Sequence, residues 1–488
     1  MKPEKISDAI GLIDEELITS AQTVRTRRKK RRRLVRGLAA AAVSLCLITA
    51  GVLSGIKGPE DKGVEYVYAI AEAEYPTMTP YPDEMAFVDE KTGEIDYDAY
   101  QEQFENWWES RRARMEPIAG EDGLDGFWTA TMRQFLSDAN GENRVYSPLN
   151  IYMALSMLAE LTDGNSRGQI LELLGADSIE KLRTQASAIW NASYCRDGAV
   201  TSVLANSLWL NEGVDFERSV MDMLAENYYA SSYQGKMGSS DFNKMLQSWL
   251  NDQTGDLLKE QAEGIGFDTD TILALASTVY FQARWYDEFL PQNTKEGTFH
   301  AEGGDMVCEF MHQTNIQSYY WGEKFSAMAK GLEDAGDMWL ILPDEGVTID
   351  DLLLDDELSE MMLAGGEWKN NSFTQINLSM PKFDAASDLD IIKGLENLGI
   401  TDIFDAEISD FSSMTKETDE IYVSEAEHAA RVVVDEEGCT AAAFTVMEAS
   451  GSGMPEDEVD FVLDRPFLFA ITNDAGFPLF IGIVNQPV

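Results

Sequence analysis

The chain has 488 residues, with 86 acidic residues against 37 basic ones, so its formal net charge is −49. This charge disfavours binding to nucleic-acid phosphates. Four cysteines and three histidines exclude an iron–sulfur protein, a multi-zinc protein and a disulfide scaffold, whereas 44% hydrophobic residues are typical of a chain with a packed core.

The first 56 residues have the pattern of a membrane anchor. Nine of the twelve residues 25–36 are basic, and residues 37–56 carry no charge. Twenty residues in a helix span about 30 Å, the thickness of a bilayer core, and the basic side stays in the cytoplasm. We predict a basic cytoplasmic head over residues 1–36 and a transmembrane helix or uncleaved signal anchor over 37–56, with the remainder outside the cell. The alternative is a signal peptide cleaved near Ala50, which would give a secreted protein.

Residues 57–120 are predicted to form an acidic extracytoplasmic spacer. Tyr75, Thr79 and Tyr81 each precede a proline, which favours extended chain. Within the spacer, aromatic residues recur at helical spacing over residues 96–114. Because this stretch includes the adjacent pair Trp107 and Trp108, we expect the helix to dock on the following domain.

Residues 121–488 are predicted to form one large domain of mixed helices and strands. The apolar run 151–161 predicts a buried helix, ended by Asp163, Gly164 and Asn165. Strands far apart in sequence indicate a large non-local sheet, which folds slowly and is easily trapped. The predicted helices are 127–136 and 151–161, and the predicted strands are 201–210, 272–281, 376–380, 421–423, 467–471 and 479–484.

Nine short motifs in this domain resemble, in order and spacing, those of the serpin family of serine protease inhibitors. The resemblance, which is to bacterial secreted or membrane-anchored members, implies an α+β fold. This fold has a large central mixed sheet, additional sheets, eight or nine helices and an exposed reactive loop near the C-terminus. The motifs are 147–151 (SPLNI), 163–167 (DGNSR), 205–209 (ANSLW), 279–285 (VYFQARW), 380–383 (MPKF), 398–404 (LGITDIF), 435–443 (DEEGCTAAA), 464–469 (DRPFLF) and 478–482 (PLFIG).

The resemblance implies irreversible suicide inhibition, in which a target serine protease forms a covalent acyl-enzyme with the loop. The protein is then not an enzyme, has no catalytic residue, cofactor or metal, and is expected to be a monomer. Residues 438–447 contain no charge and no proline, so nothing in them blocks entry into a sheet as a central strand. The alternative is that these residues form only a flexible, alanine-rich surface loop. The expected hinge consists of Glu436, Glu437, Gly438, Cys439, Thr440, Ala441, Ala442 and Ala443.

The scissile bond is less sharply defined than the hinge. The family's usual offset from Gly438 places it after Ser452, and Gly453 and Met454 are further candidates, although Pro455 disfavours cleavage after Met454. None of the three candidates is Arg or Lys. An elastase-like or subtilisin-like protease is therefore expected in preference to a trypsin-like one.

The resemblance also implies a cluster of four residues where the central strands part to admit the loop: Ser147, Asn150, Ser277 and His428. The family usually has serine at the position of Asn150 and asparagine at that of Ser277. If Asn150 and Ser277 contact each other, exchanging the amide and the hydroxyl between the two positions would preserve their hydrogen bonds. The alternative is that the two substitutions arose independently.

Other readings have less support in the sequence. His300, His312 and His428 have no recognisable nucleophile elbow to serve, and His300, Cys308 and His312 match no common metal spacing. Cys439 is either a redox-sensitive thiol or a small buried side chain. The main functional alternative is a serpin fold that does not inhibit but serves as a ligand carrier or surface interaction module.

Overall fold

The computed structural model describes residues 68–89, 95–115, 124–255, 259–417, 421–436 and 457–487, together with the backbone of residues 41–53. All of them belong to the unit Ala41–Val488. The predicted basic head, residues 1–36, lies outside the described residues.

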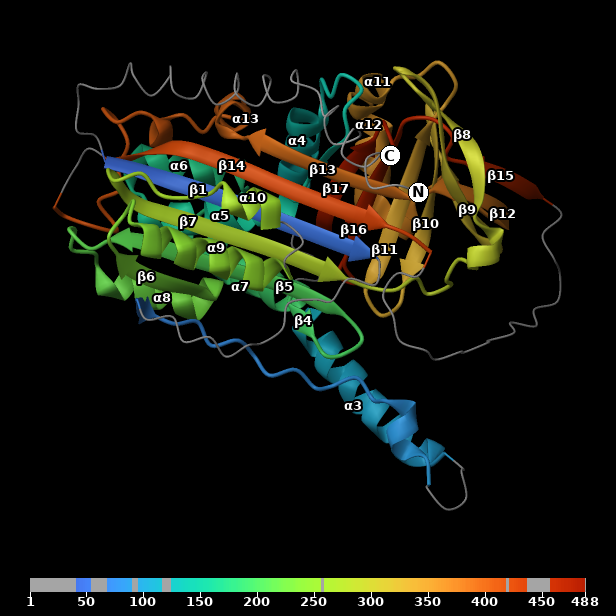
Figure 1. Ribbon diagram of the computed structural model, residues 1–488, viewed down its shortest axis with the longest axis horizontal. Helices are drawn as coiled ribbons and strands as arrows, with labels where there is room; N and C mark the ends of the chain where they lie inside the picture. The colour runs from blue at the N-terminus through green and yellow to red at the C-terminus, as the bar shows by residue number, and fades with distance from the viewer. Residues whose placement is uncertain are drawn as a thin grey trace, which may run out of the picture. The chain divides into compact units, whose positions relative to one another are not determined.

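One large mixed sheet forms the centre of this unit (Figure 1). Its long strands are buried, as their apolar runs predict: β5 and β7 lie side by side and antiparallel, with nearly every residue buried. The strand order is β13 (Phe383–Asp390), β14 (Ile421–Val434), β1 (Ala41–Leu53), β7 (Thr271–Gln282), β5 (Thr201–Asn211), β6 (Ala230–Gly235) and β2 (Ala69–Ala71), with β4 (Cys195–Arg196) paired to β5.

A second sheet lies at one end of the first. It contains the two C-terminal apolar runs as the antiparallel pair β16 and β17, whose residues form part of the core. Its strand order is β15 (Glu458–Val462), β12 (Asn371–Pro381), β9 (Gly304–Trp321), β10 (Phe325–Leu332), β11 (Gly336–Pro343), β16 (Phe467–Thr472), β17 (Pro478–Val484) and β3 (Arg144–Tyr146), with β8 (Lys295–Ala301) paired to β9.

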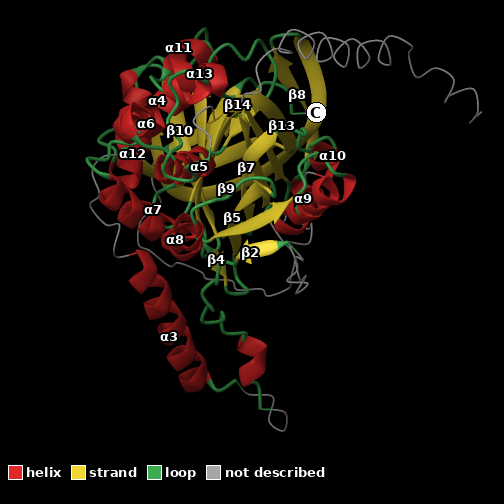
Figure 2. Ribbon diagram, turned by 90° about the vertical axis from the view of Figure 1, so that its left-hand side faces the viewer, coloured by secondary structure: helices red, strands yellow, loops and turns green. Residues whose placement is uncertain are grey.

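Helices cover both faces of the central sheet: α9 and α10 lie over one face, and α5 to α8 over the other (Figures 1 and 2). The described part of residues 124–487 contains ten α-helices, α4 to α13, rather than the eight or nine expected. The helices are α3 (Tyr97–Met115), α4 (Asp125–Leu136), α5 (Pro148–Leu161), α6 (Gly164–Leu173), α7 (Ile179–Ser193), α8 (Arg218–Tyr228), α9 (Ser240–Thr254), α10 (Lys259–Glu263), α11 (Ile349–Leu353), α12 (Asp356–Ala364) and α13 (Ile392–Asn397).

The central helix α5 shows why this sequence folds as predicted. Its N-cap is Ser147, whose hydroxyl accepts a hydrogen bond from the main-chain amide of Asn150, and Pro148 occupies the first turn. All 14 of its residues are buried. Asp163 then caps the start of α6, so the chain turns where the sequence indicates. The α+β fold class and the large mixed sheet are confirmed.

The helix predicted over residues 37–56 is not observed. Residues 41–53 form β1, a central strand between β14 and β7 and parallel to both. In the part of the chain that the structure describes, no helix is both long and apolar enough to cross a membrane. An uncharged run without proline satisfies a central strand as well as a bilayer helix, because in both settings the neighbours are apolar and the main chain is fully hydrogen-bonded.

Candidate functional site

The predicted reactive loop connects the two sheets. It leaves the central sheet after β14, where the described chain continues to Glu436, and re-enters at Asp457 before β15 of the second sheet. Of the predicted hinge, only Glu436 has a described position. The other hinge residues and the scissile candidates lie outside the described residues, namely Glu437, Gly438, Cys439, Thr440, Ala441, Ala442, Ala443, Ser452, Gly453 and Met454.

Glu436 fixes the chain at the point where the loop begins. Its Oε1 lies 2.8 Å from Lys382 Nζ and accepts a hydrogen bond from the Thr294 hydroxyl at 2.7 Å. Its carbonyl accepts from the Phe289 amide at 3.2 Å. Burial alone would raise the pKa of Glu436, but the hydrogen bonds from Lys382 and Thr294 outweigh it and lower the pKa. Glu436 is therefore ionised at neutral pH. It holds in place the start of the loop, Asp435 and Glu436, which we call the loop root.

The residue before Glu436 rests on an aromatic support. Trp285 Nε1 donates to the Asp435 carbonyl at 2.9 Å. The ammonium of Lys330 contacts the same aromatic rings: its Nζ lies 5.1 Å from the Trp285 ring centroid and 4.4 Å from the Phe289 ring centroid. Lys330 Nζ also donates a hydrogen bond to the Asp287 carbonyl at 2.8 Å. Burial lowers the pKa of Lys330 to about 7. The loop root is thus held by both main-chain and side-chain contacts.

The four residues of the predicted sheet-opening cluster lie together in the core. The Ser147 amide donates to His428 Nε2 at 3.0 Å, and Asn150 Nδ2 donates to the Ser277 carbonyl at 3.2 Å. All four are at most 2% exposed. These bonds join α5 to β14 through His428 and to β7 through Ser277, the two strands on either side of β1. The role of the cluster in sheet opening remains a prediction.

Asn150 and Ser277 meet through the main chain of Ser277. The Ser277 hydroxyl donates instead to Asn206 Oδ1 at 2.6 Å, and Asn206 Nδ2 donates to the Tyr228 carbonyl at 2.8 Å. The exchange of amide and hydroxyl is therefore not an exchange within one side-chain contact. Asn206 was missed as a member of the cluster, although the motif 205–209 that contains it was among the family landmarks.

His428 is an uncharged group at the centre of the cluster. It is fully buried, and burial lowers its pKa to about 3. Because Nε2 accepts the Ser147 amide, we assign the ring proton to Nδ1. Nδ1 has no hydrogen-bond partner among the described residues. Protonation of His428 would place an uncompensated charge between α5 and β14.

β1 passes directly beside this cluster. Its residue Leu47 is the register partner of both Ser277 on β7 and His428 on β14. Figure 1 shows β1 as the blue strand between the orange-red β14 and the yellow-green β7. The place where the resemblance predicts that the sheet opens is therefore occupied by a strand from the N-terminal part of the chain.

The helix α3 docks on the domain chiefly through Trp107 and Arg111, and Arg114 also donates to the Tyr194 carbonyl at 2.8 Å. Trp107 Nε1 donates to Asp197 Oδ2 at 2.8 Å, and Arg111 pairs with Asp197 at 3.3 Å and with Asp474 at 2.5 Å. Trp107 is 1% exposed whereas Trp108 is 42% exposed, so one tryptophan of the adjacent pair makes the contact. The predicted docking of this helix is confirmed.

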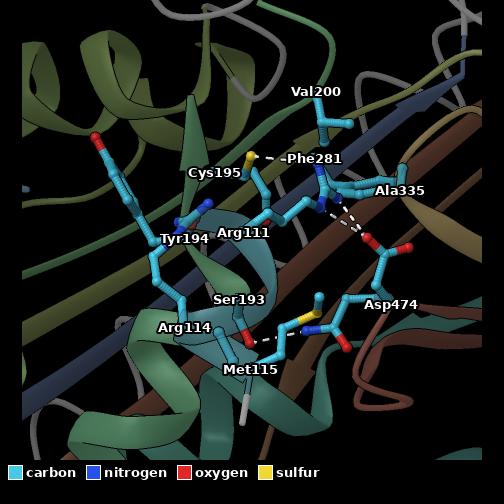
Figure 3. A pocket seen from close by; sticks show the side chains of 13 residues that line it. Arg111, Arg114, Met115, Ser193, Tyr194, Cys195, Val200, Phe281, Ala335 and Asp474 are labelled. Atoms are coloured by element: carbon cyan, nitrogen blue, oxygen red, sulfur yellow. Dashed lines mark hydrogen bonds and ion pairs between the residues drawn. The ribbon is translucent and has the colours of Figure 1, made fainter. Parts of the chain in front are cut away.

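A small cavity lies beside Arg111 (Figure 3). It is lined by α3 together with Ser193, Cys195 and Asp474, and its volume is about 20 Å³, room for about one water molecule. Burial raises the pKa of Cys195 to about 12, so its thiol is protonated and unreactive. This cavity belongs to the helix docking and offers no space for a larger ligand.

Comparisons with known proteins agree on the domain. The family model described as Serpin (serine protease inhibitor) matches residues 123–487. Serpin-ZX of Arabidopsis thaliana is 28% identical over 375 residues, covering 72% of this chain and 93% of the relative. The native-state crystal structure of tengpin, a thermophilic serpin, has a TM-score of 0.65 at 26% identity and covers 74% of this chain and 93% of tengpin.

A fourth comparison is a likeness of fold alone. Human thyroxine-binding globulin with bound thyroxine has a TM-score of 0.64 at 20% identity, covering 75% of this chain and 98% of that one. The family match begins at residue 123, so β1 and α3 both precede it.

Proposed function

The chain belongs to the serpin family of serine protease inhibitors, and we propose that it irreversibly inhibits an elastase-like or subtilisin-like serine protease through its loop 437–456. The observation that carries this proposal is the place of the loop. It joins β14 of the central sheet to β15 of the second sheet and starts from a root fixed by Glu436, and its residues 438–447 contain no charge and no proline.

The first step of the proposed mechanism is ordinary proteolysis. The serine hydroxyl of the protease attacks the carbonyl carbon of the residue before the scissile bond, Ser452 in our assignment. The new ester bond forms as the peptide bond breaks, and the amine of the following residue leaves with a proton from the protease histidine. The protease is then covalently attached to the first half of the loop.

The second step is insertion of that half into the central sheet. One edge of β14 is paired with β13, so a chain returning from Glu436 can pair with β14 only on the side that faces β7. It would run antiparallel to both strands. About fifteen residues at roughly 3.3 Å each would carry the attached protease about 50 Å. Distortion of its oxyanion hole would then prevent hydrolysis of the ester.

A protease panel tests the proposal. The protein is incubated with elastase, subtilisin, chymotrypsin and trypsin, and an SDS-stable complex with elastase or subtilisin is expected. Mass spectrometry of the released C-terminal peptide identifies the scissile bond. Cleavage of the loop by these proteases without a stable complex, both in the unmodified chain and in a variant whose residues 41–53 cannot occupy the central sheet, would contradict the proposal and favour the non-inhibitory carrier or interaction module.

Hinge variants provide a matched pair for the insertion step. In the proposed inserted strand, alternation would turn Cys439 towards the sheet core and Thr440 to the opposite side, so Cys439→Arg would bury a guanidinium and should convert the inhibitor into a substrate. Thr440→Arg should be milder. Equal losses of complex from both variants would show that this register is wrong.

We also propose that the serpin domain acts outside the cell, anchored by residues 37–56 or secreted after their removal. The support is the sequence of nine bases followed by an uncharged run. Protease treatment of intact cells should release the large domain, and complete protection would contradict this location. An anchored form requires residues 41–53 to leave the central sheet.

A further inference from the structure

The strand β1 fills the central sheet along the full length of its neighbour. Ala41 to Leu53 are in parallel register with β14 from Ile421 to Val434, and Ala42 to Val52 are in register with β7. With β1 in place, β14 has a partner on both edges, β13 on one side and β1 on the other.

The inserted reactive loop would occupy this same position between β7 and β14. Leu53 lies opposite Val434, the last residue of β14, two residues before Glu436, from which the loop departs. A loop folding back from Glu436 would meet an edge of β14 whose main-chain groups are already paired with β1. A polypeptide edge accepts one neighbour, so β1 and the inserted loop exclude each other.

We propose that residues 41–53 are an internal plug that holds the inhibitor inactive, and that transfer of this segment into an anionic bilayer frees the position between β7 and β14 for the reactive loop. This inference rests on the proposed inhibitory function. It adds a regulator, the N-terminal segment of the chain, and a partner, a negatively charged membrane surface.

The sequence of the segment suits both environments. Residues 41–53 contain no charge and no proline, as a central strand requires, and they lie within the uncharged residues 37–56, which are long enough to span a bilayer. The nine bases in residues 25–36 would attract the segment to anionic lipids. The main chain is hydrogen-bonded either to β7 and β14 or within a helix, and the two states cannot coexist in one molecule.

A proline pair tests whether β1 blocks insertion. Ala50 lies within β1, opposite Tyr280 and Arg431, whereas Ala41 is its first residue. Proline lacks the amide that a central strand donates but is tolerated at the first residue of a strand. Ala50→Pro in the full chain should raise the yield of SDS-stable complex at least about tenfold, because it favours the unplugged state. Ala41→Pro should behave as the unmodified protein does.

Vesicles test the proposed trigger. Phosphatidylglycerol vesicles should raise the complex yield of the unmodified chain towards that of Ala50→Pro, and phosphatidylcholine vesicles should not. An effect of Ala50→Pro without any effect of phosphatidylglycerol would overturn the bilayer as the trigger.

A cross-link measures the occupancy of the sheet independently of inhibition. Cys46 is the register partner of Glu427 on β14. In the Glu427→Cys variant, a short thiol-specific cross-linker should join residues 46 and 427, and the joined protein should no longer respond to phosphatidylglycerol vesicles. The variant that carries both Cys46→Ser and Glu427→Cys is the control. Absence of the cross-link would overturn the plug.

The results separate this inference from the function on which it rests. Equal complex yields from the unmodified chain and Ala50→Pro would overturn the plug while leaving the inhibitory function intact. Loop cleavage without complex in every variant, including Ala50→Pro, would instead overturn the inhibitory function, and the regulatory role of β1 with it.

Discussion

The segments that precede the serpin domain are attached in two different ways. The strand β1 is held through its main chain, in register with two neighbouring strands over its whole length. The helix α3 is held by a few side chains, above all Trp107 and Arg111, which meet Asp197 and Asp474. The first attachment constrains the main chain, whereas the second depends on particular side chains.

This difference determines which changes each attachment tolerates. A backbone ladder accepts many side chains and is disrupted by proline, whereas a buried ion pair fails when one partner is removed, because the other charge remains desolvated. A main-chain attachment of this kind does not depend on particular side chains, as our proposal that the reactive loop replaces β1 requires. A segment held by Arg111 and Trp107 is specific to its docking surface.

Removal of the Arg111 guanidinium should have the largest effect. The side chains of Arg111 and Asp197 are 8% and 1% exposed, and Arg111→Ala leaves the Asp197 carboxylate buried without its cation. The expected loss is about 3–5 kcal/mol of unfolding free energy, measured by urea denaturation. Arg112→Ala, at the exposed neighbouring residue, is the control. Similar small losses from both variants would show that the ion pair does not hold α3.

Trp107→Phe should have a smaller effect on the same attachment. It keeps most of the buried ring but removes the Nε1 donor to Asp197 Oδ2, a hydrogen bond to a charged group worth about 1.5–3 kcal/mol. Trp108→Phe, at a residue 42% exposed, should change stability by less than about 0.5 kcal/mol. Hydrogen exchange of the β1 amides should be unchanged in both variants. Faster exchange there would show that the two attachments are coupled.

The sequence predicted one of these two attachments. The aromatic spacing predicted the helix over residues 96–114 and its docking, and α3 follows it closely. The segment 37–56 was predicted as a membrane helix, because length and absence of charge do not distinguish a bilayer from a vacant position in a sheet. That position is created by β7 and β14, more than 200 residues away in sequence.

At the candidate site, too, the sequence identified residues but not the contacts that distant parts of the chain create. The family motifs identified Ser147, Asn150, Ser277 and His428, which the fold brings together. They did not reveal that Lys382 holds Glu436, because that pairing depends on how the two sheets meet. β14 was predicted only as 421–423, since Glu425, Glu427 and Arg431 interrupt the apolar pattern that its buried face continues.

Acidification should weaken the strands that flank β1. The pKa of His428 is about 3 in the folded protein and ordinarily 6.5, so between these values the unfolded chain binds more protons and stability falls as the pH falls. The slope rises from about half of 1.4 kcal/mol per pH unit at pH 6.5 to nearly the full value at pH 5, so the loss between these pH values is about 1.6 kcal/mol. His428→Gln keeps an acceptor for the Ser147 amide and should remove this part of the acid dependence. His300→Gln, at an exposed histidine, should retain it.

The smallest expected effect is the coupling between Asn150 and Ser277. Asn150→Ala removes the donor to the Ser277 carbonyl, and Ser277→Ala removes the hydroxyl that donates to Asn206, each at a cost of about 1–2 kcal/mol. Because Ser277→Ala keeps the carbonyl that Asn150 contacts, the two losses should add to within about 0.5 kcal/mol in a double-mutant cycle of unfolding free energies. A coupling above about 1 kcal/mol would mean that the side chains interact directly and that the amide and hydroxyl were exchanged as a pair. Additive losses would show that the Asn150 side chain links α5 to β7 through the Ser277 carbonyl, independently of the Ser277 side chain.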